Sequence, residues 1–248
     1  AYYELSFTLF TIGKGKDAIP YLEKVVQADS PYRGPANDIL GSIYDDDNQP
    51  DKAIEYYKAG IKVAPGYQRL HFNLAIMYLR QKKYAEAEVC AIDAIKLDPK
   101  HASSQRVYAI ATYRLNKRGC SLLAWCSFLI LEPQTKRSTE AYNYIHNILN
   151  YGITKTGEKS DKITISTNDM DYGNCSMPIA ILAATSDQKG LTSTDSLTLQ
   201  LKSLFEVSVM FAGKTKDDFY ARFYADYFNK LAASDMMLAV TRRVSLSA

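Results

Sequence analysis

Prolines recur along the first half of this chain at a constant interval of 34 residues. They stand at Pro31, Pro65, Pro99 and Pro133. The last three each follow a stretch with helical apolar spacing, in the sequences IKVAP, IKLDP and LILEP. Proline ends a helix because it lacks the backbone N–H and clashes with the preceding turn. The period therefore predicts a series of similar helical units, each closed by a proline.

Other positions repeat in step with the prolines and predict two antiparallel helices in each unit. Small residues would let the two helices approach closely, and large ones would fill the space between units. One such hairpin cannot bury its own apolar face, so the copies must stack. Residues 2–30 hold an earlier copy of the same pattern. The positions in register are large at Leu40, Leu74 and Tyr108, small at Gly41, Ala75 and Ala109, and small again at Ala53, Ala87 and Ser121.

The spacing L-G-x2-Y-x8-A-x3-Y-x7-P resembles the tetratricopeptide repeat, and the resemblance covers about residues 1–135. It is carried in the second copy by Leu40, Gly41, Tyr44, Ala53, Tyr57 and Pro65. The resemblance implies an all-α, right-handed α-solenoid of four helix hairpins. A further helical pattern follows Ser138 or Thr139 and is similar to the capping helix that ends such arrays. We therefore expect a repeat array with its capping helix over residues 1–151.

Residues 152–248 predict a separate, small helical region of unknown function. Residues 152–162 are polar and turn-rich, as in a linker, and KITIS at 162–166 permits one short strand. A buried helix is expected at 179–185, and another begins near Thr194 or Asp195 and ends at Gly213. The last helix carries a broad aromatic face, which we interpret as a core stripe rather than a ligand platform. Its aromatic residues are Phe219, Tyr220, Phe223, Tyr224, Tyr227 and Phe228.

The C-terminal part is loosely similar to that of uncharacterised bacterial tetratricopeptide-repeat proteins with an aromatic-rich helical segment. Such relatives often carry secretion signals, so this resemblance slightly favours a periplasmic or secreted location over the cytoplasm. The chain begins at Ala1 within an expected helix, so we expect the natural N-terminus, and any signal peptide, to lie upstream.

Composition excludes several classes of protein and supports no catalytic one. The net charge of +3 is too small to indicate a nucleic-acid-binding surface. No apolar run reaches the roughly 18–20 residues that a membrane-spanning helix needs. The cysteines and histidines lack zinc-ligand spacing. GKGK at 13–16 and DDDN at 45–48 fall in turns between helices, and the latter lacks the residues of a calcium loop. We therefore expect that the protein is not an enzyme and that it has no catalytic residue, metal or cofactor.

The resemblance implies that the first helix of each unit lines a concave groove that holds a partner peptide or helix. Four arginines lie among these positions, and arginine suits bidentate recognition of carboxylates. We therefore expect a protein partner with apolar and acidic groups. The groove residues are Tyr3, Phe7 and Phe10 in the first unit, Asp38, Ser42, Asp45 and Asp46 in the second, Arg69, Phe72, Asn73, Ile76, Leu79 and Arg80 in the third, and Arg106, Ile110, Tyr113 and Arg114 in the fourth.

One known class of these repeats grips C-terminal Glu-Glu-Val-Asp peptides through a clamp of Lys, Asn and Arg side chains. The corresponding places here are Asp38, Ser42, Asn73, Ser103 and Val107. Asn73 alone matches, and Asp38 would repel a carboxylate. This sequence therefore argues against that function.

Three alternatives stay open at this point. The apolar groove could be covered by the C-terminal helices of the same chain. A ligand-binding or hydrolytic site could lie in the C-terminal region, or exposed tyrosines could recognise a cell-envelope glycan. The oligomeric state is open as well, because exposed repeat ends can stack.

Overall fold

A computed structural model describes residues 1–149, 153–155, 161–163, 193–212 and 219–245 of the 248. By its contacts the chain forms two compact units, Ala1–Lys100 (unit 1) and His101–Ala248 (unit 2). Each unit is described by itself. The predicted boundary at residue 151 is a division by sequence pattern rather than by contacts, and it stays a prediction.

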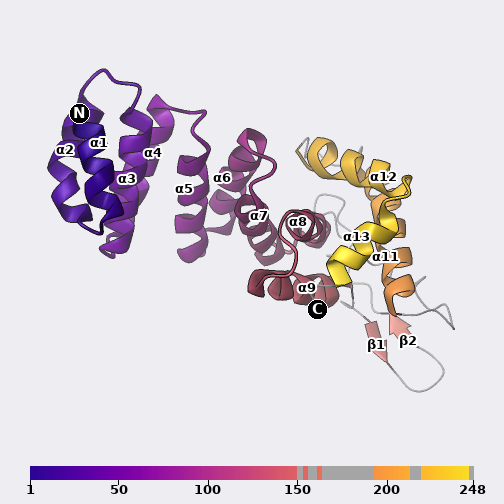
Figure 1. The fold of residues 1–248 in the computed structure, drawn as a ribbon. Coiled ribbons are helices and arrows are strands. Elements are labelled where there is room, and N and C mark those ends of the chain that lie inside the picture. Colours follow the sequence, from indigo (N-terminus) through magenta and orange to yellow (C-terminus); the bar gives the residue numbers. More distant parts are fainter. Residues whose placement is uncertain (150–152, 156–160, 164–192, 213–218, 246–248) are drawn as a thin grey trace. The chain divides into compact units, whose positions relative to one another are not determined.

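Unit 1 consists of three consecutive helix hairpins (Figure 1). Each first helix packs against its own second helix, and α2 and α4 also pack against the first helix that follows them. This stacking is the solenoid arrangement that the 34-residue period predicts. The helices are α1 (Tyr2–Thr11), α2 (Gly15–Gln27), α3 (Arg33–Asp46), α4 (Pro50–Val63), α5 (Gln68–Arg80) and α6 (Tyr84–Leu97).

A left-handed residue follows the first helix of every hairpin and turns the chain back. The φ angles are +79° at Gly13, +56° at Asn48, +60° at Lys82 and, in unit 2, +62° at Asn116. The amide after each of these residues bonds a carbonyl of the helix just ended; that of Lys83, for example, donates to the Tyr78 carbonyl at 2.9 Å. Glycine and asparagine adopt this conformation at low cost, so the GKGK and DDDN turns have the structural role predicted for them.

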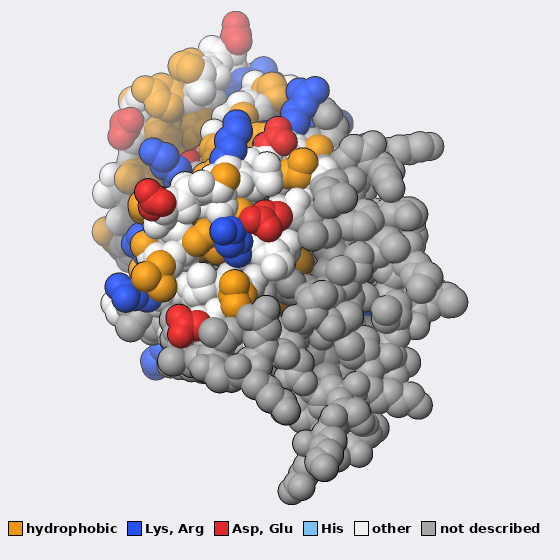
Figure 2. All heavy atoms as spheres, turned by 90° about the vertical axis from the view of Figure 1, so that its right-hand side faces the viewer, with side chains coloured by type: hydrophobic (Ala, Val, Ile, Leu, Met, Phe, Trp, Pro, Cys, Tyr) orange, Lys and Arg blue, Asp and Glu red, His pale blue; other side chains and the backbone are white. Residues whose placement is uncertain are grey.

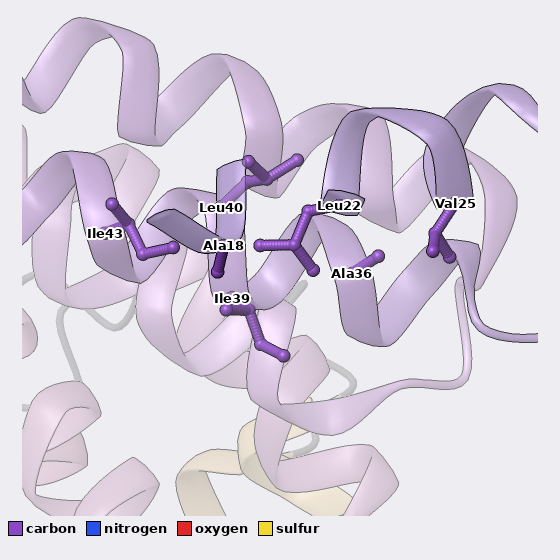
Figure 3. Packing of buried hydrophobic residues seen from close by; sticks show 7 residues of the cluster. All are labelled: Ala18, Leu22, Val25, Ala36, Ile39, Leu40 and Ile43. Carbon is purple, nitrogen blue, oxygen red and sulfur yellow. The ribbon is translucent and has the colours of Figure 1, made fainter. Parts of the chain in front are cut away.

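The core of unit 1 lies between neighbouring hairpins. Figure 3 shows the apolar side chains of α2 and α3 directed into the space between these two helices. Within the second hairpin, Gly41 permits close contact between α3 and α4, because a Cβ at this position would lie 2.3 Å from Tyr57 Cε1. The small position of the repeat therefore has the predicted role. The cluster consists of Ala18, Leu22, Val25, Ala36, Ile39, Leu40 and Ile43.

Unit 2 begins with a fourth hairpin and a single further helix. These are α7 (Ala102–Arg114), α8 (Arg118–Leu131) and α9 (Lys136–Leu149). Helix α8 is buried almost all round, since α7, α9 and the C-terminal helices all pack against it. This explains why the fourth copy departs most from the repeat pattern: Trp125 and Phe128 are both fully buried.

The described C-terminal elements are two short strands and a cluster of helices. Strands β1 (Ile153–Lys155) and β2 (Asp161–Ile163) pair antiparallel, with Ile153 opposite Ile163. Helix α11 (Ser193–Ala212) includes the start predicted near Thr194 or Asp195, whereas Gly213, its predicted end, lies outside the described residues. The aromatic segment forms a π-helix, η3 (Tyr220–Ala225), which continues as α12 (Asp226–Ala232) and is followed by α13 (Met237–Ser245).

Two sequence expectations for this region need correction. The segment expected to be a linker contains β1 and the first two residues of β2, so the expected strand begins one residue earlier, at Asp161. The aromatic segment is a π-helix where an α-helix was expected. The helix expected at 179–185 lies outside the described residues, as does Cys175. Among the described parts, none of the helices is both long and apolar enough to cross a membrane.

Candidate functional site

The predicted groove residues of unit 1 lie on three first helices that contact one another in sequence, α1 with α3 and α3 with α5. Phe7 is 47% exposed, whereas Tyr3, Phe10, Phe72 and Ile76 are half-buried. The surface of α1, α3 and α5 is termed the first-helix face of unit 1, and each of these apolar side chains is at least partly exposed.

Asp38 lies at the centre of this face and is only 1% exposed. Its Oδ2 is 3.2 Å from Arg69 Nε, and its Oδ1 accepts a hydrogen bond from Asn73 Nδ2 at 2.7 Å. Burial raises the pKa of Asp38, while Arg69 and Asn73 oppose that rise by stabilising the charged form. Both partners belong to the next repeat, so this contact joins α3 to α5.

A second contact between the same helices lies nearer their C-terminal ends. Arg80 Nη1 donates to both carboxylate oxygens of Asp45 at 2.7 Å. The Arg80 side chain is 61% exposed and that of Asp45 is 23% exposed, so water screens this pair more than the one at Asp38. Ser42 lies between the two contacts, and its hydroxyl is 3.4 Å from the Tyr57 hydroxyl.

The predicted groove residues of unit 2 lie on α7. Arg106 donates to Glu140 Oε2 of α9 from Nε at 3.1 Å and from Nη2 at 2.7 Å. Tyr113 makes an edge-on contact with Tyr144 of α9, and Ile110 is half-buried. Arg114 is exposed and forms no ion pair with any residue that the structure describes.

Three of the four predicted groove arginines are thus held by carboxylates of this chain. Sequence reasoning missed this because each acid belongs to a neighbouring repeat or to α9. The signal was nevertheless present: Asp45 and Arg80 are 35 residues apart, and Arg106 and Glu140 are 34 apart, which places each pair side by side in a 34-residue repeat.

Aromatic rings surround the start of the first-helix face. The ring of Tyr3 stacks on Tyr32 at 4.7 Å and lies 6.3 Å from that of Phe7. Tyr32 is 46% exposed and was absent from the predicted groove, because it precedes α3 rather than lying within it. The pKa of Tyr67 is raised by burial and by the nearby Asp38 charge. The face is therefore aromatic as well as charged.

A cavity of about 390 Å³ lies at the other end of α1 and α3. Phe10 and Ile43 give it apolar walls, and the turn between α1 and α2 closes one side. Lys16 and Asp47 form an ion pair there. Its full lining is Phe10, Gly13, Lys14, Gly15, Lys16, Asp17, Ile43, Asp46 and Asp47.

A second cavity of about 480 Å³ lies along α2, α3 and α4. The stacked rings of Tyr44 and Tyr56, 5.2 Å apart, line it together with Val26 and Val63. Arg33, Lys52 and Glu55 also border it, so its charges are mixed. Figure 2 shows one face of the molecule, on which acidic and basic side chains are interspersed with hydrophobic ones over the described part.

The histidines and cysteines that the structure describes have structural surroundings. His71 is buried, with Nε2 2.9 Å from the Pro65 carbonyl oxygen, and His101 Nδ1 is 2.8 Å from the Ser104 hydroxyl. Burial raises the pKa of the Cys90 thiol to about 11 and also raises that of Cys126. Within the described ranges, no group of three or more His, Cys, Asp or Glu is placed to hold a metal ion.

The aromatic segment at the C-terminus packs into unit 2. Tyr224 stacks on Tyr108 at 5.6 Å, and its hydroxyl donates to Gln105 Oε1 at 2.5 Å. Phe219, Tyr224 and Phe228 are all buried. The interpretation as a core stripe is therefore confirmed for Phe219, Tyr220, Tyr224 and Phe228 but is wrong for Tyr227, which is 48% exposed. The contacts of Tyr224 on α7 are with residues outside the predicted groove.

Comparison with known families assigns the central part of the chain. Residues 40–102 match the sequence model of a family described as "Tetratricopeptide repeat". The match runs from α3 to the start of α7 and so covers the second and third hairpins. No curated protein matches the chain.

Proposed function

From the match of residues 40–102 to the tetratricopeptide-repeat family, we propose that the chain is a protein-binding module whose first helices hold a segment of a partner. Repeats of this family generally mediate protein–protein interactions and are typically scaffolds rather than catalysts. The proposed surface in unit 1 consists of α1, α3 and α5.

The exposure of Phe7 is the observation that carries the proposal. Nearly half of this large apolar side chain is exposed, and it adjoins the half-buried Tyr3 on the same helix. Phe10 adds a third ring to that helix. Contiguous exposed apolar groups on a soluble protein commonly mark an interaction surface.

The ion pairs beneath this surface support a binding role of a particular kind. They fix α3 relative to α5 through Asp38 and Asp45, so the apolar side chains are held on a rigid support. A surface ordered before binding loses less conformational entropy when the partner arrives. We propose that the arginines contribute mainly to this order and less to direct capture of the partner.

A capture experiment from the native host tests the proposal. The full chain serves as bait beside two variants, Phe7→Glu on the first-helix face and Val89→Glu on a second helix. Val89 is 59% exposed, so both variants place a charge at an exposed apolar position. We expect one partner that the Phe7 variant loses and the Val89 variant keeps.

The opposite pattern would contradict the proposal, since loss with Val89→Glu alone would place the partner on the second helices. Circular dichroism of both variants would confirm that the helices are intact.

A further inference from the structure

We propose that the partner segment presents a lysine or arginine, next to an apolar side chain, to the surface formed by α1 and α3. This inference rests on the proposed function. The partner segment would then be basic, whereas the groove arginines in the sequence suggest an acidic partner.

The arginines of unit 1 offer little to an acidic partner because their charges are already balanced. Asp38 lies 3.2 Å from Arg69, and Asp45 lies 2.7 Å from Arg80. The attraction of such a close pair for a third charge is weak and is screened further by salt. An incoming carboxylate would also approach the two aspartates themselves, which repel it.

Asp46 of α3 is an exposed carboxylate that forms no ion pair with any described residue. It is the last residue of α3, whose final turn contains no basic side chain. The C-terminal end of a helix carries partial negative charge, so a carboxylate there is unfavourable by itself. A cation from a partner would relieve that cost.

The cavity beside Asp46 has room for such a cation. Its volume of about 390 Å³ exceeds that of one side chain, and the walls formed by Phe10 and Ile43 suit the aliphatic stem of lysine or arginine. Three carboxylates and two ammonium groups border it, and Lys16 is paired with Asp47. The remaining charge is therefore negative, with Asp17 and Asp46 against Lys14.

The aromatic rings of the same surface favour a cation independently of the carboxylates. Tyr3, Phe7 and Tyr32 form a row, and aromatic faces attract ammonium and guanidinium groups within roughly 6 Å. The chain itself uses this contact elsewhere, since Lys24 Nζ lies 5.0 Å from the centre of the Tyr2 ring. A basic and apolar segment thus meets both of its requirements here.

Panning a random 12-residue peptide library against the full chain tests the inference. We expect enriched peptides to carry lysine or arginine beside leucine, isoleucine or phenylalanine. The affinity of one enriched peptide is then measured by fluorescence polarisation for the wild type, Asp46→Asn and Glu23→Gln. We expect Asp46→Asn to weaken binding about five-fold at low salt, and Glu23→Gln, an exposed acid on α2, to leave it unchanged.

The other outcomes separate this inference from the function on which it rests. If the enriched peptides are instead rich in aspartate or glutamate, and Phe7→Glu abolishes their binding, the inference is wrong but the proposed function stands. If the enriched peptides are basic, and Phe7→Glu abolishes their binding while Asp46→Asn leaves their affinity unchanged, the role of Asp46 is wrong but the proposed function stands. No enriched peptide, or binding indifferent to Phe7→Glu, would contradict the proposed function and the inference together.

Discussion

Gly41 of α3 lies directly against the ring of Tyr57 in α4, with no space for a side chain between them: a Cβ at Gly41 would come within 2.3 Å of Cε1 and 2.6 Å of Cδ1. The next hairpin has Ala75 and Ala91 at the equivalent positions, both fully buried. Glycine and tyrosine in one repeat thus take the place of two alanines in the next.

This relationship predicts that Gly41→Ala destabilises the protein, by about 1–3 kcal/mol, because the added methyl group overpacks a core with no free volume. Tyr57→Ala alone should cost roughly 3–5 kcal/mol through the cavity it leaves. The double variant recreates the alanine pair and should cost less than the sum of the two. Chemical denaturation of all four proteins measures this coupling, and strict additivity would contradict the packing described here.

Lys82 is the turn residue most easily improved. Its φ of +60° costs a lysine more than it costs an asparagine, which stands at the equivalent Asn48 and Asn116. We expect Lys82→Asn to stabilise the protein by about 0.5 kcal/mol, and Lys82→Gly to have a similar effect. A lower midpoint of thermal unfolding for both variants would show that this turn is not under backbone strain.

The two arginine contacts between α3 and α5 should differ in energy. Arg69→Ala deprives the buried Asp38 of its charged partner, so we expect a loss of about 1–3 kcal/mol. Arg80→Ala breaks an exposed pair and should cost less than about 1 kcal/mol, with a dependence on salt. Equal losses in denaturant titrations would mean that burial does not distinguish the two contacts.

Asp38 should also give the protein a measurable pH dependence. Burial raises its pKa in the folded state above the ordinary value of 3.8, so the folded state binds the proton more tightly than the unfolded state. The free energy of unfolding therefore falls as the pH rises from about 3.8 through the folded pKa. The Asp38→Asn variant should lack this fall in the free energy of unfolding. If the free energy of unfolding changes with pH in parallel for the two proteins, the prediction is wrong.

In unit 2, Tyr224→Phe removes the hydrogen bond to Gln105 and leaves a buried carboxamide oxygen without that donor. We expect a cost of about 1–3 kcal/mol, because a buried acceptor loses this hydrogen bond. Hydrogen exchange should accelerate in η3 and α12 while α1 to α4 are unaffected. Unchanged exchange in η3 would show that this contact does not anchor the aromatic segment.

The repeat pattern predicts the fold well because each repeat residue has a local reason to be where it is. The 34-residue spacing of the prolines fixes the helix ends, and Leu40 and Gly41 fix which faces meet. The charged contacts were harder to predict, since they depend on pairs such as Asp45 and Arg80 that no single repeat contains. Periodicity indicates which residues share a face, but not which opposite charges on it are already joined.

The C-terminal region shows a different limit of sequence reasoning. The apolar spacing predicted α11 and the burial of Phe219 and Phe228, because burial follows directly from hydrophobicity. It did not predict the π-helix at Tyr220–Ala225, since the extra residue per turn leaves the aromatic pattern almost unchanged. Nor did it predict the pairing of β1 with β2, whose segments are too short for a clear alternation.

The most direct test of the central claim is a photo-crosslink from the first-helix face in the native host. The full chain would carry p-benzoylphenylalanine in place of Phe7 in one version and in place of Val89 in another, and adducts would be identified by mass spectrometry. The account predicts a protein adduct from position 7 that position 89 does not give, with a basic and apolar segment at the attachment point. An adduct from position 89 alone would contradict it.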